Sequence, residues 1–226
     1  MKSSTSRVRD LASNEKLIRD SFGREPAMLS DIYLDEINLA VWQRTLSSSL
    51  TEAVVRVSDI NPNLEISLIT TPEDVYSSAM KSLGSNAEAT ALCDDVANLV
   101  DMFCCLFDLK QAGLRLAMLD CAMCPRFHVD KVPCRLVTTY HGVGTEWLPH
   151  LAADRSKLGV GNQGKSDDES GLFNSVTNIE QLMKGDVALL KGEAWKGNQG
   201  AGVIHRSPQL ATQGRRLLLT LDFVDS

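Results

Sequence analysis

The residues of this chain best suited to chemistry are two histidines and an aspartate. Val129 separates His128 from Asp130, and His205 lies much later in the sequence. On a β-strand, residues i and i+2 point to the same face, so this run would present an imidazole and a carboxylate side by side. A histidine from a neighbouring strand would complete a facial triad, which iron(II) accepts while keeping open positions. His128, Asp130 and His205 are therefore the candidate catalytic and metal-binding residues.

Short strands in the second half of the chain would position this triad. Segments of four to seven residues are separated by turn formers such as Cys-Pro, Val-Pro and His-Gly-Val-Gly. No alternation of strands and helices is visible, which argues against a parallel Rossmann sheet and favours an antiparallel jelly roll. We expect strands over 113–119, 126–130, 134–140, 145–148, 186–191, 201–206 and 215–223, with a weaker candidate over 173–179.

Helical patterns dominate the first half. Apolar residues at helical spacing predict helices over 33–46 and, most strongly, over 86–110. Residues 64–70 alternate as a strand does, and Pro72 then begins a predicted helix that runs through Leu83.

The expected architecture is α+β. Residues 1–30 are polar and rich in Ser and Arg, and we expect a flexible N-terminal segment there. A single domain would span 31–226, with a mainly helical part at 31–112 packed outside a jelly roll at 113–226. Within the jelly roll, residues 154–171 are polar and Gly-rich, and a loop of this length is typically a functional lid or disordered.

Two resemblances to known families follow from longer motifs. CPRFHVDKVPCRLVTTYHGVGTEWLP, VIHRSP and RRLLLTLDF resemble an uncharacterised bacterial family of unknown function, and DEINLAVWQR is consistent with it. His-X-Asp, the distal His205 and the Arg-X-X-Leu-Thr sequence at 216–220 also resemble the iron(II)- and 2-oxoglutarate-dependent dioxygenases. That second resemblance implies a double-stranded β-helix, which is a cupin-like jelly roll.

The dioxygenase resemblance also implies roles for individual residues in a hydroxylase of unknown substrate. His128, Asp130 and His205 would bind iron(II), and the co-substrate 2-oxoglutarate would chelate it. Arg216, selected by the motif over Arg215, would hold the far carboxylate, because a guanidinium binds a carboxylate bidentately. The other candidates for contacts with this co-substrate are Tyr140, which is the first choice for sharing the far carboxylate, then Thr138, Arg135 and Arg206. For Arg206, a solvated position at the end of a strand is an equal alternative.

Other residues leave alternatives open. Cys121, Cys124 and Cys134 have the spacing of zinc ligands, but no second Cys-X-X-Cys follows, and buried thiols also behave as small hydrophobes. A rival function is a non-enzymatic, cupin-like protein that binds zinc through the triad or these cysteines. A degenerate oxygenase fold that serves as an interaction domain is a third. We expect His141 and His150 to be a turn residue and a surface residue.

Composition and net charge limit the classes of partner and the cellular compartment that we expect for this chain. The chain has 226 residues and a formal net charge of −6, which argues against a nucleic-acid partner. No apolar run at the N-terminus suggests a secretory signal, and no stretch approaches the length of a spanning helix. We therefore expect a cytoplasmic protein without a membrane partner, in which the six cysteines are reduced thiols.

Overall fold

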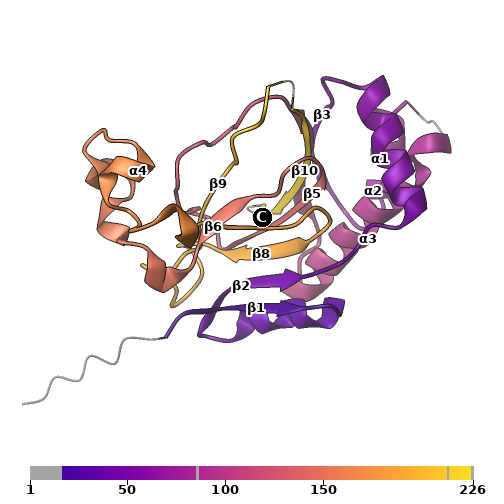
Figure 1. Ribbon diagram of the computed structural model, residues 1–226. Coiled ribbons are helices and arrows are strands. Elements are labelled where there is room, and N and C mark those ends of the chain that lie inside the picture. Colours follow the sequence, from indigo (N-terminus) through magenta and orange to yellow (C-terminus); the bar gives the residue numbers. More distant parts are fainter. Residues whose placement is uncertain (1–16, 85–86, 213, 225–226) are drawn as a thin grey trace, which may run out of the picture.

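The computed structural model describes residues 17–84, 87–212 and 214–224, which form two β-sheets, with the longer α-helices on one side of the larger sheet (Figure 1). The strands are β1 (Arg19–Gly23), β2 (Ile37–Trp42), β3 (Glu65–Thr70), β4 (Ala112–Leu119), β5 (Cys134–His141), β6 (Glu146–Leu148), β7 (Glu180–Gln181), β8 (Val187–Lys191), β9 (Ile204–Arg206) and β10 (Arg216–Asp222). The α-helices are α1 (Ser48–Ile60), α2 (Val75–Ser82), α3 (Thr90–Phe107) and α4 (Asp167–Ser170). Short 3₁₀ helices cover Pro26–Tyr33, Ala87–Ala89, His150–Ala152, Arg155–Lys157, Gly159–Asn162 and Val176–Asn178.

The large sheet has seven strands in the order β1-β2-β8-β5-β10-β4-β3. Its neighbouring strands pair antiparallel, except for the parallel pair β1 and β2. The small sheet has three antiparallel strands in the order β7-β6-β9. The protein is therefore a mixed α/β fold built around a large, mainly antiparallel sheet.

Each face of the large sheet packs against a different layer. On one face, α1, α2, α3 and the first 3₁₀ helix cover the main hydrophobic core, which includes Leu136 of β5 and Leu219 of β10. On the other face, which we call the inner face, Val137 of β5 and Ala188 of β8 pack against Trp147 of the small sheet. Because side chains alternate along a strand, odd and even positions of β5 belong to these two different layers.

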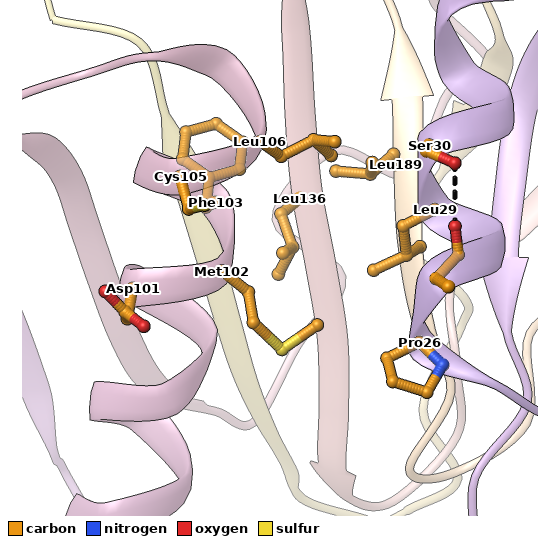
Figure 2. Close-up of a pocket in the computed structure, with 11 residues that line it drawn as sticks. Pro26, Leu29, Ser30, Asp101, Met102, Phe103, Cys105, Leu106, Leu136 and Leu189 are labelled. Carbon is orange, nitrogen blue, oxygen red and sulfur yellow. Dashed lines mark hydrogen bonds between the residues drawn. The ribbon is translucent and has the colours of Figure 1, made fainter.

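A cavity of about 400 Å³ lies on the helix side of the large sheet. In Figure 2, Met102 of α3 and Leu29 of the first 3₁₀ helix lie on either side of Leu136 and Leu189, which project from β5 and β8. Since these leucines belong to the helix-side core, the sheet itself separates this cavity from the inner face.

Most strand predictions in the second half agree with the structure. Strands occur within or next to the predicted ranges 113–119, 134–140, 145–148, 186–191 and 201–206. The same holds for the predicted strand 215–223 and, in the first half, for the strand 64–70 and the helices after Pro72 and over 86–110. No helix of the described residues has the length and apolar character needed to cross a membrane.

Three local predictions were wrong. Residues 33–46 do not form a helix, because Ile37–Trp42 is a strand whose residues are nearly all buried on both faces, so its apolar run mimics a helical stripe. Residues 173–179 contain a 3₁₀ helix at Val176–Asn178 rather than a strand. Residues 126–130 form no regular strand, and only an isolated bridge from His128 to His205 remains there.

The division at residue 112 also fails to separate helices from strands. β1, β2 and β3 precede it and belong to the same sheet as β4, β5, β8 and β10. Part of the segment expected to be flexible, 1–30, is β1 and the start of a 3₁₀ helix, whereas residues 1–16 lie outside the described part of the chain. The segment 154–171 contains two 3₁₀ helices and α4 rather than a structureless loop.

Candidate metal centre

His128, Asp130 and His205 converge on one point. The distance from His128 Nε2 to Asp130 Oδ1 is 3.7 Å, and that from His205 Nε2 to Asp130 Oδ2 is 3.5 Å. Two ligand atoms that each lie about 2 Å from one ion are at most about 4 Å apart, so both distances suit a shared metal. Among the described residues, these three form the one group of His, Cys, Asp or Glu whose ligand atoms could hold an ion.

Backbone pairing brings the two histidines together. The His128 amide donates to the His205 carbonyl at 3.0 Å, and the His205 amide donates to the His128 carbonyl at 2.9 Å. Alternation along each segment then sends the neighbouring side chains Phe127, Val129 and Ile204 into a separate apolar cluster. The imidazoles and the Asp130 carboxylate are left on the opposite side, next to one another.

The protonation of the imidazoles suits metal binding. His128 Nδ1 lies 2.9 Å from the Arg126 carbonyl oxygen, and His205 Nδ1 lies 3.1 Å from that of Val203. Carbonyl oxygens only accept, so each Nδ1 carries a proton, and Nε2 is the ring atom that faces Asp130 and could bind a metal, as in many metal-binding histidines. Burial lowers the pKa of His205 to about 4, against the opposing attraction of Asp130, so this imidazole is neutral near pH 7.

Asp130 is held in place by an arginine from β5. Arg135 donates from Nη1 to Asp130 Oδ2 at 2.7 Å, and its Nε and Nη2 donate to the Asp222 carboxylate at 2.7 and 3.0 Å. The guanidinium is therefore committed to two carboxylates. The sequence had suggested Arg135 as a contact for the co-substrate. In the structure, Arg135 instead positions Asp130, the proposed metal ligand.

Asp167, which is not among the residues predicted from the sequence, stabilises the same centre. Its carboxylate accepts from the Phe127 amide at 2.9 Å, from Arg126 Nε at 2.7 Å and from Arg206 Nη1 at 3.2 Å. These partners adjoin His128 and His205 in the sequence. The segment 154–171, interpreted from sequence as a lid, therefore contributes a buried carboxylate that ties the two histidine-bearing segments together.

Arg216 is the best placed cation near the centre. Its side chain is 2% exposed, and its Nη2 donates to Thr145 Oγ1 at 2.6 Å and to Thr139 Oγ1 at 3.1 Å. No carboxylate of the described residues lies within ion-pair distance of it. Burial lowers the pKa of this guanidinium to about 10, a shift that the charge of Glu146 partly opposes, so Arg216 remains cationic at neutral pH.

Thr145 locates Arg216 relative to the triad. It immediately precedes β6, in which Trp147 pairs with His205 of β9. Thr145 and Trp147 are two residues apart, so their side chains share a face, and the positions are roughly 7 Å apart along the strand. The guanidinium and the His205 imidazole therefore both face the space between the sheets.

The other predicted co-substrate contacts are not brought to this space. Tyr140 and Thr138 are on the helix side of β5, and the Tyr140 hydroxyl donates to Asp95 of α3 at 2.6 Å. Thr139, one residue away, has the orientation that Tyr140 and Thr138 were expected to have. Arg206 is bound to Glu146 at 2.6 Å and to Asp167, and Arg215 is exposed.

The cysteine alternative for zinc has no support in the geometry. Cys121 and Cys124 are exposed and Cys134 is buried at the start of β5, and no described trio of ligand atoms includes them. Burial raises the pKa of the Cys134 thiol strongly, which keeps it protonated. In α3, Cys104 is buried and Cys105 is exposed.

Gly142 and Gly144 follow β5, where the backbone bends closely past neighbouring segments. Gly142 has a φ of +84°, and a Cβ there would collide with the Arg215 carbonyl oxygen. A Cβ on Gly144 would likewise collide with the Leu182 carbonyl oxygen. These close approaches let the β5–β6 connection pass beside the start of β10, where Arg216 begins the strand.

Comparison with protein families gives one match that spans most of the chain. The family model described as "Protein of unknown function (DUF1826)" matches residues 23–222. None of the curated proteins matches the chain in sequence.

Several solved structures have a similar backbone at very low sequence identity. The dioxygenase for auxin oxidation 1 from Arabidopsis thaliana, in a complex with 2-oxoglutarate, is 13% identical, with 92% of this chain and 93% of that chain covered and a TM-score of 0.48. A prolyl-4-hydroxylase from Pseudomonas putida is 10% identical, with 88% and 98% covered and a TM-score of 0.47. The dioxygenase for auxin oxidation in rice is 12% identical, with 92% and 83% covered and a TM-score of 0.49. At this level of similarity, a functional argument depends on the chain's own side chains.

The placement of Tyr140 predicts that its hydroxyl contributes to stability and not to metal binding. Burial raises the pKa of Tyr140 well above 10, so the hydroxyl is a permanent donor to Asp95, which also binds Arg44 at 2.6 Å. Tyr140→Phe should lower the free energy of unfolding by about 1–2 kcal/mol, measured by urea denaturation. Cobalt(II) affinity, measured by calorimetry, should be unchanged. Weaker cobalt binding at unchanged stability would contradict this placement.

Proposed function

The chain belongs to the DUF1826 family, whose description assigns no activity, and we propose that it is an iron(II)- and 2-oxoglutarate-dependent dioxygenase. The observation that carries this proposal is the buried Arg216, which faces the same space as the triad and lacks a carboxylate partner among the described residues. A buried cation without a counter-ion is costly, and a dianionic ligand would offset that cost.

The proposed metal fits the donor set. Two imidazoles and one carboxylate suit a divalent transition metal and match the facial triad of non-haem iron(II) oxygenases. When bound, iron(II) would supply the redox chemistry, in which 2-oxoglutarate and dioxygen give succinate and carbon dioxide while one oxygen atom enters a substrate C–H bond.

The chain's own residues would orient the reactants. Arg216 would bind the far carboxylate of 2-oxoglutarate through its fork of N–H donors, with the Thr139 and Thr145 hydroxyls completing the contact. Val203 and Trp147, buried between the sheets next to His205, would exclude water from this end of the space. Arg135 and Asp167 would keep Asp130 and the two histidine segments in register.

In this proposal the two sheets are the halves of a double-stranded β-helix. The segment that carries His128 would act as an irregular strand beside β9, to which it is joined by the His128–His205 bridge. The triad would then lie at one edge of the space between the sheets, with Arg216 further inside.

The same three ligands could hold zinc in a non-enzymatic protein, but that function leaves Arg216 without a role. A metal-handling site needs no buried guanidinium facing its metal, and the cost of desolvating Arg216 would then be uncompensated. The oxygenase proposal accounts for both features with one ligand.

Removal of the carboxylate ligand tests the metal centre. Asp130→Ala should abolish iron(II) binding and the formation of succinate from 2-oxoglutarate, because a pair of imidazoles is a much weaker site for iron. Circular dichroism should show a folded protein, since Arg135 retains its contacts with Asp222. Normal succinate formation by this variant would exclude the assignment.

Neighbouring arginines provide a matched test of co-substrate binding. Arg216→Gln should raise the half-saturating concentration of 2-oxoglutarate by about 10-fold or more, because it removes charge-assisted hydrogen bonds, while iron(II) affinity is retained. Arg215→Gln should leave both quantities unchanged, because Arg215 is exposed. Equal effects from the two variants would show that the buried guanidinium does not bind the co-substrate.

A further inference from the structure

The small sheet leaves part of the inner face of the large sheet uncovered, and a second cavity lies there. The small sheet packs on β2, β8 and β5, whereas this cavity, of about 470 Å³, lies over β10, β4 and the edge strand β3. Across its floor, Ser67, Arg115 and Thr220 are paired in one row of the sheet, and Ile69, Gly113 and Asp222 are paired in the next row. This volume falls in the range of small-molecule sites.

The cavity is in direct contact with the residues that hold the metal ligands. Arg135 and Asp222 line it, and the same Arg135 donates to Asp130 Oδ2 at 2.7 Å. One guanidinium therefore separates the cavity from the triad. By contrast, the apolar cavity of Figure 2 lies beyond the sheet and has no such connection.

Arg115 of β4 gives the cavity a cation whose present partners a ligand could replace. Its Nη2 donates to Glu65 Oε1 at 3.1 Å and its Nη1 to Met123 Sδ at 2.9 Å. A thioether is a weak acceptor, and the Glu65 side chain is 64% exposed, so neither contact satisfies this guanidinium strongly. A carboxylate that enters the cavity could bind Arg115 bidentately and take the place of both partners.

Apolar atoms form much of the remaining wall. Ile69 and Met123 line the cavity with apolar side chains, and Ile69 is 62% exposed although it lies over the sheet. An exposed apolar residue beside a charged group suits a ligand that has both an apolar and an ionised part.

We propose that this cavity binds the oxygenase substrate, and that the substrate is a small carboxylic acid with an apolar body, whose carboxylate binds Arg115. This inference rests on the proposed function for its reaction, because the C–H bond to be hydroxylated would be presented toward the triad past Arg135. Its binding chemistry is independent of that reaction and can be measured separately.

Two acids with different apolar bodies, 4-phenylbutanoate and octanoate, are suitable probes, and 4-phenylbutanamide is a neutral control. Calorimetric titration of the full chain, without oxygen and with excess iron(II) and 2-oxoglutarate, keeps Arg216 occupied and prevents turnover. At least one acid should bind, and 4-phenylbutanoate should bind about 10-fold or more tightly than its amide. Arg115→Gln should abolish this preference for the acid.

A second variant separates recognition from a structural role. Glu65→Gln removes the competing carboxylate and should tighten binding of the acid by up to about fivefold, as expected for the loss of an exposed ion pair. If Arg115 and Glu65 only stabilised the fold, neither variant would change the ratio of acid to amide affinity. Failure of both acids to bind, or a preference for the acid that survives in Arg115→Gln, would overturn the inference.

Succinate formation without added substrate distinguishes this failure from failure of the proposed function. If Arg216-dependent succinate formation occurs but the acids do not bind, the substrate inference alone is wrong. If the acids bind as predicted and 2-oxoglutarate is never consumed, the cavity is confirmed as a carboxylate-binding site, and the oxygenase proposal is wrong.

Discussion

The candidate site depends on one backbone contact, the reciprocal pair of hydrogen bonds between His128 and His205. Residues remote in sequence meet there, and the contact fixes both the separation of the imidazoles and the side on which they lie. Because Phe127 and Ile204 are anchored in an apolar cluster on the other side, a slip of one residue would exchange ligands for core side chains. The supports from Asp167 and Arg135 act on segments that this contact has already aligned.

Arg216 introduces a second constraint of a different kind. The triad alone is compatible with several divalent metals, and its geometry does not discriminate among functions. A guanidinium buried at the start of β10, held by two threonine hydroxyls, selects for an anion in the adjacent space. The close turn at Gly142 and Gly144 brings the β5–β6 connection, and with it Thr145, next to that guanidinium. In the proposed function, the same two sheets would therefore position both the metal and the co-substrate.

The sequence was sufficient to predict β4, β5, β6, β8, β9 and β10, because period-two alternation and turn formers are local signals, and it also identified the three residues that converge. It was wrong to expect strands over 126–130 and 173–179. In β2, burial on both faces hides the two-residue alternation of a strand, so the segment was mistaken for a helix. The helix α1 was left unassigned, although Leu50, Ala53, Val54 and Val57 form a helical stripe after the capping residue Ser47. Tyr140 and Thr138, rather than Thr139, were predicted as co-substrate contacts. The sequence does not show which face of β5 points between the sheets, because tertiary packing determines that face. Asp167 carried no signal within an acidic, Gly-rich segment, because its partners are distant in sequence.

The most direct test of the account is an anaerobic titration of the iron(II)-loaded protein with 2-oxoglutarate, followed by visible absorbance. Chelation of iron(II) by a 2-oxo acid gives a charge-transfer band that neither component shows alone. If the protein is a 2-oxoglutarate-dependent oxygenase, this band appears on addition of 2-oxoglutarate and saturates with one co-substrate per iron. A protein that retains zinc tightly and shows no spectral or calorimetric response to 2-oxoglutarate would contradict it.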